Sequence, residues 1–296
     1  MHACILNKLN RDSARHVILL CLLFLVAISG CRKSTTTEVN LPYQERYNQV
    51  YGTDTLQQYD LFLPEGRDHQ TEIILVIHGG GWISGKKEEW NYYAQRFCDF
   101  GFAAISMNYR LANDSIHYLE MLDDIDSMIM CISRNTDTWG IGSGRIALFG
   151  YSAGGHLALL YSYSRDKGQN IHSVISLAGP TDLQDSLLWE SPGLYNNIVL
   201  MTGDPDPADW HPANPVSCIS AANAATLLIH GTNDSIVPFS QSVKLNQLLA
   251  ASFTPVQLLL LEDETHFFSA AATEIFLNAT KQFLDENNRG NQLLVP

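Results

Sequence analysis

A chain of 296 residues, 46% of them hydrophobic, is long enough to bury one large core, and a charged fraction of 17% is too low for a disordered chain. The formal net charge of −13 repels the phosphates of nucleic acids, and no basic stripe offsets it, so we expect no nucleic-acid partner. The same negative charge gains nothing from anionic lipid headgroups.

The first 30 residues have the pattern of a bacterial lipoprotein signal peptide. Three basic residues precede an apolar run over residues 17–28, which is short for a membrane span and suits the hydrophobic part of a signal peptide. The run ends in Ile28-Ser29-Gly30-Cys31, an aliphatic residue and two small residues before a cysteine, as in a lipobox. We expect Cys31 to carry lipid and to begin the mature chain. Ordinary cleavage after Ser29, which would release a free secreted protein, is the alternative.

Residues 31–45 are polar and rich in threonine, and we expect a flexible tether that holds one domain, residues 46–290, away from a membrane. Lipid at Cys31 would be the membrane contact of a protein in the bacterial cell envelope. The next residue is Arg32 rather than the aspartate that signals inner-membrane retention in enteric bacteria, so the outer membrane is the expected location.

Three cysteines, Cys98, Cys131 and Cys218, remain once the signal peptide and Cys31 are set aside. An odd number in an exported chain permits at most one disulfide, and buried thiols are the favoured interpretation. The cysteines offer no metal-ligand spacing, and the aspartates between residues 204 and 209 lack the spacing of a known calcium loop. We therefore expect neither a metal ion nor another cofactor.

From residue 57 onwards, strand and helix patterns alternate, which is typical of an α/β fold with a mostly parallel central sheet and helices on both faces. The run Ile73–Ile77 is continuously apolar, as a strand buried on both faces requires. The other predicted strands are 57–64, 102–107, 145–149, 174–177, 226–229 and 256–261, and the predicted helices are 88–100, 117–132, 153–163, 240–249 and 270–285. The alternation breaks between residues 180 and 221. Since a structureless loop of this length is uncommon in a compact domain, we expect a small lid-like insertion there.

The sequence GYSAG at residues 150–154 joins a predicted strand to a predicted helix almost without a loop. Ser152 therefore lies on a sharp turn, and the flanking glycines are needed because side chains there would collide with the tight backbone. Such a turn raises the serine hydroxyl above the carboxyl edge of the sheet, where a substrate can reach it. The pattern alone is weak, and an incidental serine at a glycine-rich helix start is the alternative. The strand before it and the helix after it favour a nucleophile.

The sequence HGGGW at residues 78–82 directly follows a predicted buried strand. Three glycines let the backbone approach a ligand and point its N–H groups into a site. In acyl transfer these donors, with the N–H of Ala153, would form an oxyanion hole, and we favour Gly80 and Gly81 as the donors. A phosphate-binding loop is the alternative, but the lysine of a P-loop and the G-x-G-x-x-G spacing are absent. We expect His78 to be structural.

A serine nucleophile needs a base, and the base needs a carboxylate to orient it. Asp234 lies in the turn after the strand predicted at 226–229, and His266 follows the last predicted strand. We therefore expect Ser152, Asp234 and His266 to be the catalytic residues. The alternatives are His156 or His230 as the base and Glu264 or Asp182 as the acid.

Taken together, these motifs resemble the esterase/lipase branch of the α/β-hydrolase superfamily, in particular bacterial acetyl-xylan and feruloyl esterases. The order serine, acid, histidine along the chain is the order that this fold uses. One departure is Tyr151, which stands before the nucleophile where hormone-sensitive-lipase relatives have an acidic residue. Besides the two glycine motifs, the likeness between Tyr59 and Phe268 includes Tyr59–Pro64, Asn108-Tyr109-Arg110, Asp124, Leu228–Gly231 and Val237-Pro238.

The resemblance implies an α/β-hydrolase fold and a serine carboxylesterase that works through an acyl-enzyme. Its partner would be a small-molecule or glycan ester, such as a short-chain, acetyl or feruloyl ester. An amide hydrolase of formamidase or peptidase type with the same three residues is the first alternative. A non-catalytic, surface-anchored binding protein is the second, although such a protein has no need of an exposed serine on a strained turn.

Overall fold

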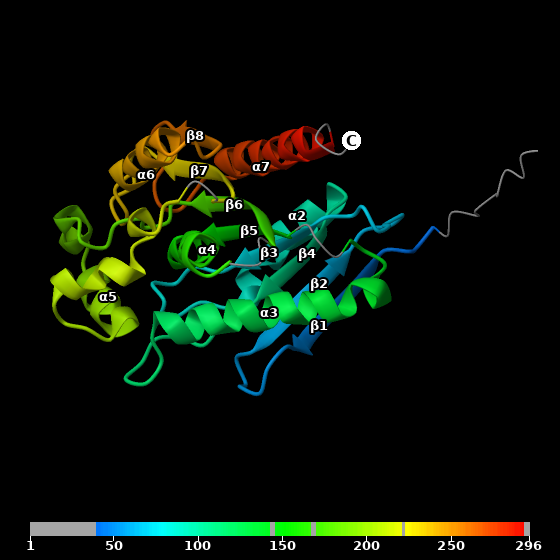
Figure 1. Ribbon diagram of the computed structural model, residues 1–296, viewed down its shortest axis with the longest axis horizontal. Helices are drawn as coiled ribbons and strands as arrows, with labels where there is room; N and C mark the ends of the chain where they lie inside the picture. Colours follow the sequence, from blue (N-terminus) through cyan, green and yellow to red (C-terminus); the bar gives the residue numbers. More distant parts are fainter. Residues whose placement is uncertain (1–39, 143–145, 167–169, 221–222, 293–296) are drawn as a thin grey trace, which may run out of the picture. The chain divides into compact units, whose positions relative to one another are not determined.

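An eight-stranded sheet forms the centre of the described chain (Figure 1). The computed structural model describes residues 40–142, 146–166, 170–220 and 223–292, so the predicted signal peptide and the lipid site at Cys31 lie outside these ranges. The strands follow the spatial order β1-β2-β4-β3-β5-β6-β7-β8. Their bounds are β1 Gln44–Val50, β2 Gln58–Leu63, β3 Ile73–Ile77, β4 Ala103–Met107, β5 Ile146–Tyr151, β6 Ile171–Leu177, β7 Ala225–Gly231 and β8 Val256–Leu261.

Pairing is antiparallel from β1 to β2 and from β2 to β4, and parallel from β4 through to β8. β1 is an edge strand that the sequence pattern did not predict. It begins at Gln44, so the last two residues of the tether predicted over 31–45 pair with β2 instead. Its residues QERYNQV are mostly polar and only partly buried, and an edge strand of this kind carries little hydrophobic periodicity.

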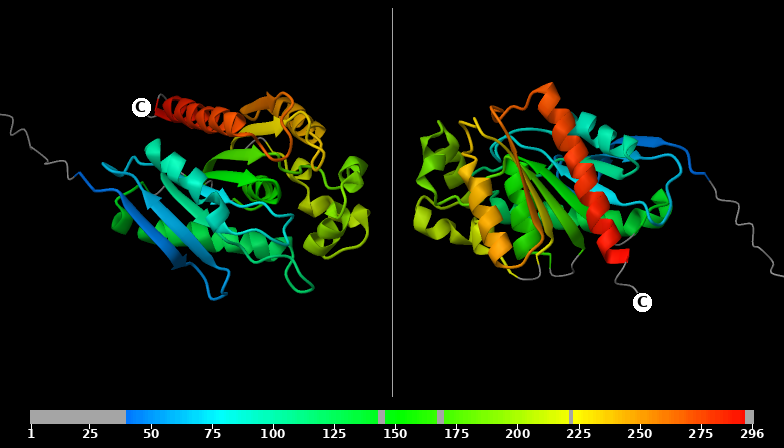
Figure 2. Two further views of the ribbon diagram at one scale, coloured as in Figure 1. Left: turned by 180° about the vertical axis from the view of Figure 1, so that it is seen from behind. Right: turned by 90° about the horizontal axis from the view of Figure 1, so that it is seen from above.

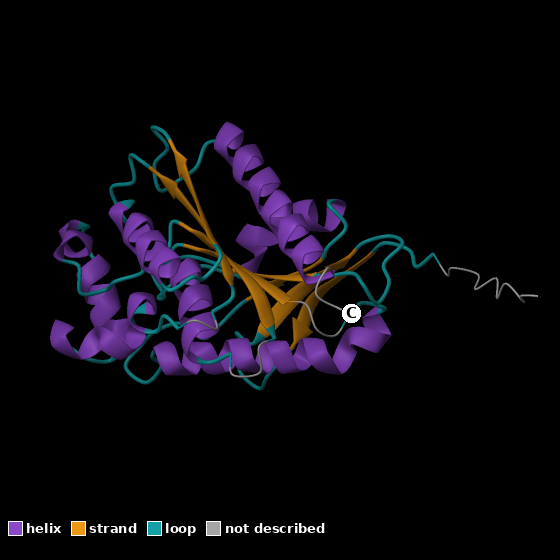
Figure 3. Cartoon of the chain, turned by 45° about the horizontal axis from the view of Figure 1, so that its top comes forward, coloured by secondary structure: helices purple, strands orange, loops and turns teal. Residues whose placement is uncertain are grey.

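Helices cover both faces of the sheet (Figures 2 and 3), as predicted. Along β3, Ile73, Leu75 and Ile77 belong to one buried cluster while Ile74 and Val76 belong to another, which explains the continuous apolar run. Helices α3, α4 and α6 contribute to the first cluster, and α2 and α7 to the second. Their bounds are α2 Asn91–Asp99, α3 Tyr118–Trp139, α4 Ala153–Ser164, α6 Ser240–Ala251 and α7 Ala270–Gln292.

Three helices differ by more than two residues from their predicted extents, and one of them, predicted over 270–285, continues to Gln292 as α7. The helix predicted over 117–132 continues to Trp139 and ends at Gly140, which has a left-handed φ of +69°. Its last turns are less apolar than the predicted part, but Thr136 and Trp139 are buried. The helix predicted over 88–100 begins as a 3₁₀ turn, η1, at Lys87–Trp90, before α2 starts.

The segment predicted as an insertion, 180–221, is folded over its described part. It contains η2 (Ser186–Glu190), α5 (Leu194–Thr202), η3 (Pro207–Ala213) and η4 (Pro215–Ser217). Leu188, Ile198 and Trp210 are fully buried and join the cluster that contains α4. Figure 1 shows the insertion at the end of the sheet to which the arrows of β6 and β7 point. In parallel α/β sheets this is the end where ligands bind.

Candidate active site

Ser152 stands on the sharp turn between β5 and α4. Its φ of +52° and ψ of −119° form a combination that non-glycine residues rarely adopt. A Cβ on Gly150 would lie 2.2 Å from the carbonyl oxygen of Gly154, and a Cβ on Gly154 would lie 2.1 Å from that of Ile77. Both positions therefore require glycine, and the crowded backbone holds the turn that presents the Ser152 hydroxyl.

Three side chains from distant segments meet in series at this turn. The Ser152 Oγ lies 3.0 Å from Nε2 of His266, and Nδ1 of His266 lies 2.7 Å from Oδ2 of Asp234. Since the carboxylate can only accept, Nδ1 carries the proton and Nε2 accepts from the hydroxyl. All three residues are buried. This geometry allows the imidazole to take the hydroxyl proton while its orientation stays fixed.

Asp234 is held in its ionised form by its surroundings. Its Oδ1 accepts hydrogen bonds from the backbone N–H groups of Ile236 and Val237, both at 2.9 Å. Burial by itself would raise the pKa of Asp234, but hydrogen bonds from His230 and His266 outweigh it and hold the pKa well below its usual value. The carboxylate is therefore available to stabilise an imidazolium on His266.

The loops that carry Asp234 and His266 are joined through their backbones. The N–H of Asn233 donates to the carbonyl of Glu264 at 2.9 Å. A Cβ on Gly231 would lie 2.3 Å from the same carbonyl oxygen, so glycine at this position lets the two loops come together. The distance between acid and base is set by this contact as well as by their side chains.

The glycine loop after β3 forms one wall of a cavity of about 490 Å³ in front of Ser152. Gly80 and Gly81 both line it and have left-handed φ values of +114° and +57°. A Cβ on Gly80 would lie 2.1 Å from the Ser84 carbonyl oxygen, and one on Gly81 would lie 2.6 Å from Nδ2 of Asn197. Only glycine fits this loop without strain.

The rest of the cavity combines an apolar wall with one helix start. Ala153, the third predicted donor, is the first residue of α4, where N–H groups have no partner within the helix. The aliphatic and phenyl side chains that line the cavity are Ile83, Pro192, Leu194, Ile236 and Phe267. Leu194 and Ile236 come from the insertion and from the loop of Asp234, so separate segments complete the cavity.

Trp82 and His156 support the glycine loop from behind, and the sequence pattern did not indicate this. Trp82 is fully buried and has a φ of +64°, which is unusual for a large side chain. Its indole N–H donates to Nδ1 of His156 at 3.2 Å, and Nε2–H of His156 donates to the Ala213 carbonyl at 2.8 Å. Burial lowers the pKa of His156 to about 4, so this imidazole is neutral and links the glycine loop to the insertion.

Three further side chains, His78, Tyr109 and Tyr151, also hold the loops of the site. His78, expected to be structural, stacks on Tyr109 with ring centroids 4.3 Å apart, and burial lowers its pKa to about 4. The Tyr109 hydroxyl donates to the His78 carbonyl at 3.1 Å. On the opposite side, the Tyr151 hydroxyl donates to the backbone carbonyl of His266 at 2.8 Å. The residue that departs from the hormone-sensitive-lipase pattern thus contacts the loop of the base.

A family model described as BD-FAE matches residues 59–249 of the chain. The chain belongs to the BD-FAE family. Isoprenylcysteine alpha-carbonyl methylesterase ICME of Arabidopsis thaliana is 27% identical in an alignment 254 residues long, which covers 79% of this chain and 58% of the relative. The acylamino-acid-releasing enzyme of Sus scrofa is 29% identical in an alignment 259 residues long, which covers 80% of this chain and 34% of that enzyme. This chain therefore spans only part of the length of these curated relatives.

Among solved structures, a truncated form of a carbohydrate esterase from gut microbiota matches this BD-FAE member with a TM-score of 0.72. The match covers 84% of this chain and 97% of the other at 19% sequence identity. At this identity the likeness shows the fold, and the predicted α/β-hydrolase fold is confirmed.

The other candidate acids and bases have partners of their own in this BD-FAE member, and one of them, His230, also contacts Asp234. His230 contacts the Ser242 hydroxyl at 2.7 Å and donates to the Val237 carbonyl at 2.9 Å, with its Nε2 also 3.3 Å from Asp234. Glu264 accepts from the hydroxyl and N–H of Ser269 at the start of α7, and Asp182 pairs with Lys244. Neither Glu264 nor Asp182 takes part in the hydrogen bonds that connect Ser152, His266 and Asp234.

The cysteines of the described chain are not joined in disulfides. Cys98, Cys131 and Cys218 are free thiols; Cys98 is buried, and the other two are half-buried. No group of three or more His, Cys, Asp or Glu residues in the described ranges could hold a metal ion. Within those ranges, no helix is both long enough and apolar enough to cross a membrane.

Proposed function

We propose that this BD-FAE member is a serine carboxylic-ester hydrolase that works through an acyl-enzyme. The observation that carries the proposal is the series Ser152, His266 and Asp234, with its contacts of 3.0 and 2.7 Å, which opens onto a cavity lined by the glycine loop. An oriented base beside a hydroxyl on a strained turn is the arrangement that acyl transfer needs.

In the first half of the reaction, the Ser152 Oγ attacks the ester carbonyl carbon while Nε2 of His266 takes the hydroxyl proton. The carbonyl oxygen becomes negative, and the N–H groups of Gly80, Gly81 and Ala153 are the donors proposed to stabilise it. The carbon–oxygen bond to the alcohol then breaks, and the imidazolium gives its proton to the departing alcohol. Ser152 keeps the acyl group as an ester.

In the second half, water replaces the alcohol. His266 takes a proton from the water as its oxygen attacks the acyl carbon, and the same donors stabilise the second oxyanion. The bond from the carbon to Ser152 Oγ breaks, and the imidazolium returns the proton to the serine. The acid is released and the enzyme is restored.

We infer that the substrates are short-chain or carbohydrate-linked esters, such as acetyl or feruloyl esters. Two observations support this class. The cavity in front of Ser152 has a volume within the range of about 300–1,000 Å³ that is usual for small-molecule sites, and part of its wall is apolar. A protein with the same fold is named as a carbohydrate esterase.

The test is the activity of Ser152→Ala on 4-nitrophenyl acetate. We expect kcat to fall about 10⁶-fold, since the remaining groups cannot form the acyl-enzyme. A fluorophosphonate probe should label the wild-type protein at Ser152 and leave the variant unlabelled. Ester cleavage retained by the purified variant would overturn the proposal, and so would an unlabelled wild-type protein, which is what a non-catalytic binding protein predicts.

Amide hydrolysis is the second candidate, because one relative is named an acylamino-acid-releasing enzyme. The same residues would attack an amide carbonyl, and the leaving group would be an amine. Parallel assays on a nitrophenyl ester and an aminoacyl nitroanilide with the same acyl group separate the two. A higher kcat/KM for the nitroanilide would favour the amide hydrolase.

For location we propose lipid anchorage at Cys31 in a bacterial cell envelope, with the outer membrane favoured. The support is the lipobox pattern at residues 28–31, since Cys31 lies outside the described residues. A Cys31→Ser variant expressed in a bacterial host should move from the detergent phase to the aqueous phase in a phase-partition experiment. An unmodified wild-type protein in the aqueous phase would contradict the anchor.

A further inference from the structure

A second cavity adjoins the one in front of Ser152. It has a volume of about 600 Å³ and lies between the loop that precedes α3 and helix α5 of the insertion. We call it the groove; the residues that line it are Asp114, His117, Asn196, Asn197, Val199, Leu200 and Gly203. Asn197 lines both cavities and lies beside Gly81. The groove is therefore next to the proposed oxyanion donors.

Three polar side chains that line the groove make no polar contact with other described residues of the protein. Among the described residues, the carboxylate of Asp114 and the side-chain amides of Asn196 and Asn197 have no hydrogen-bond or ion-pair partner. Nδ1–H of His117 donates to the Leu200 carbonyl at 3.0 Å, so this ring is held by the insertion. Polar groups that converge on a cavity without internal partners are available to a ligand.

The loop that carries Asp114 is fixed by its neighbour. Oδ1 of Asn113 accepts from the N–H of Ser115 at 2.9 Å and from that of Ile116 at 3.2 Å, and Asn113 and Ile116 form a β-bridge. The side chain of Asn113 therefore stabilises the turn, while the next residue, Asp114, is exposed to solvent. The loop held by Asn113 therefore fixes the position of the Asp114 carboxylate at the groove.

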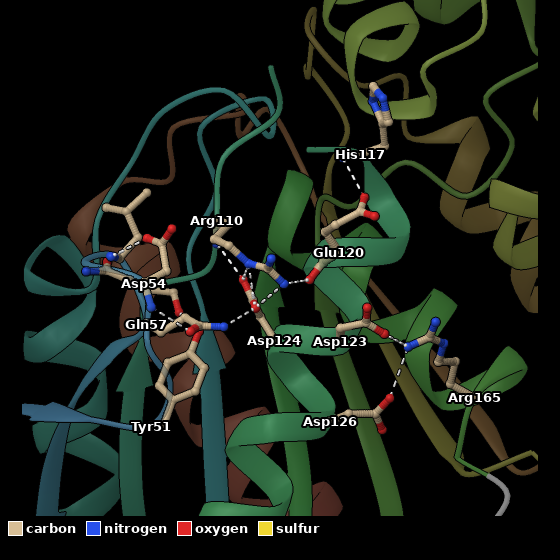
Figure 4. A network of polar contacts seen from close by, with 12 residues as sticks. Tyr51, Asp54, Gln57, Arg110, His117, Glu120, Asp123, Asp124, Asp126 and Arg165 are labelled. Carbon is tan, nitrogen blue, oxygen red and sulfur yellow. Dashed lines mark hydrogen bonds and ion pairs between the residues drawn. The ribbon is translucent and has the colours of Figure 1, made fainter. Parts of the chain in front are cut away.

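The start of α3 is fixed by a polar network (Figure 4). Arg110 pairs with the fully buried carboxylate of Asp124 and also donates to the Glu120 carbonyl at 2.9 Å. The Glu120 carboxylate accepts from the N–H of His117 at 2.9 Å. Figure 4 shows the His117 ring above this network, directed toward the ribbon of the insertion.

Gly203 packs the end of α5, one wall of the groove, against His117 at the start of α3, the other wall. It ends α5 with a left-handed φ of +74°, and a Cβ on it would lie 3.0 Å from three atoms of the His117 ring. With the bond from His117 to Leu200, this close packing connects α5 to the start of α3. Both walls are therefore positioned before any ligand binds, which lowers the entropy cost of binding.

The chemistry of the lining selects a class of ligand. Among the described residues that line the groove there is no lysine or arginine, so they offer no cation to a phosphate or carboxylate group. They instead offer a carboxylate acceptor together with amides that both donate and accept, a set that matches neighbouring hydroxyl groups, which do both as well. An apolar acyl group is better accommodated in the other cavity, against Leu194 and Ile236.

We propose that the groove binds the alcohol half of a carbohydrate ester, one or more sugar rings, while the acyl group occupies the cavity at Ser152. The inference rests on the proposed function and assigns Asp114, Asn196 and Asn197 to recognition of the sugar hydroxyls.

The first test compares two esters with one acyl group and different alcohols, acetylated xylo-oligosaccharides and 4-nitrophenyl acetate. The measured quantity is the ratio of kcat/KM for the oligosaccharide to kcat/KM for the nitrophenyl ester. We expect Asn196→Ala to lower this ratio about 3- to 10-fold and Asp114→Ala to lower it about tenfold or more, since hydrogen bonds to a charged group are the stronger. Asp99→Ala, at an exposed residue that lines neither cavity, should keep the wild-type ratio.

The second test measures binding without turnover. Unacetylated xylotriose is titrated into Ser152→Ala protein and into the double variant with Asp114→Ala, and we expect binding to weaken about tenfold in the double variant. Equal binding, or an unchanged ratio in the first test, overturns the inference. So does a changed preference between nitrophenyl acetate and butyrate in Asp114→Ala, because the groove would then hold the acyl group.

These outcomes are separate from a failure of the proposed function. If the wild-type protein cleaves no ester, the ester-hydrolase proposal is wrong, yet xylotriose binding that depends on Asp114 would still support a sugar site. If the wild-type protein cleaves both esters and Asp114→Ala changes neither the ratio nor the binding, the esterase proposal stands and the sugar site is wrong.

Discussion

The cavity at Ser152 and the groove beside it share Asn197 but use their polar side chains in different ways. In the cavity, Ser152, His266 and Asp234 bond to one another, and backbone N–H groups hold the second oxygen of the carboxylate. In the groove, Asp114 has no partner among the described residues. The groups proposed for chemistry are oriented in advance, while the groups proposed for recognition are left free for a ligand.

Removing the charge of Asp234 while keeping its shape tests whether the groups in the cavity are oriented for chemistry. We expect Asp234→Asn to lower kcat about 10⁴-fold, because an amide cannot hold the required tautomer of His266 or stabilise its charged form. Steady-state hydrolysis of 4-nitrophenyl acetate measures this.

The matched control is Glu264→Gln, in the loop of His266 but bonded to Ser269 at the start of α7. Its activity should stay within a few-fold of the wild type. A loss as large as that of Asp234→Asn would instead make Glu264 the acid.

A substitution in the glycine loop, where the cavity meets the groove, tests the proposed oxyanion donor Gly81. Gly81→Ala places a Cβ at a left-handed φ and against the amide of Asn197. We expect kcat to fall about 10²–10³-fold, the usual cost of losing one oxyanion donor. Gly101→Ala is the control, because Gly101 also has a left-handed φ, of +94°, but nothing within 4 Å of its Cβ position. If the two variants keep equal activity, the position of the Gly81 N–H has no part in the reaction.

The turn at Ser152 could be predicted from sequence because the motif is short and a strand and a helix flank it. Gly150 is required by the backbone of Gly154 and Gly155, a few residues away, whereas the constraint that Ile77 places on Gly154 comes from another strand and was not needed for the prediction. The buried parallel strands were also predictable, since Ile73–Ile77 faces apolar neighbours on both sides.

Features that depend on distant contacts were missed. Trp82 and His156 are 74 residues apart, and Tyr151 and the His266 carbonyl are 115 apart, so no local pattern connects them. The polar edge strand Gln44–Val50 has no periodicity of its own and forms only because β2 is there to pair with it. Likewise, only the three-dimensional structure shows that Asp114 has no partner among the described residues.

His156, which supports the glycine loop, makes the free energy of unfolding depend on pH, and this effect is independent of catalysis. Burial lowers the pKa of His156 to about 4, although its hydrogen bond to the Ala213 carbonyl opposes the shift, while an unfolded histidine titrates near 6.5. Above about pH 6.5 neither state binds the proton, and the contribution to stability is complete. Between about pH 6.5 and 4 the unfolded chain binds a proton that the folded chain does not, so the free energy of unfolding decreases as the pH falls.

His156→Gln tests this, because glutamine can accept from Trp82 and donate to Ala213 but does not titrate. The variant should lose less stability between pH 6.5 and 4, by about 1.4 kcal/mol per pH unit, as determined from urea unfolding at several pH values. His69→Gln, at an exposed histidine, should follow the wild-type curve. Parallel curves for His156→Gln and the wild type would mean that His156 binds a proton equally well in both states, and the link from the glycine loop to the insertion would not depend on a neutral imidazole.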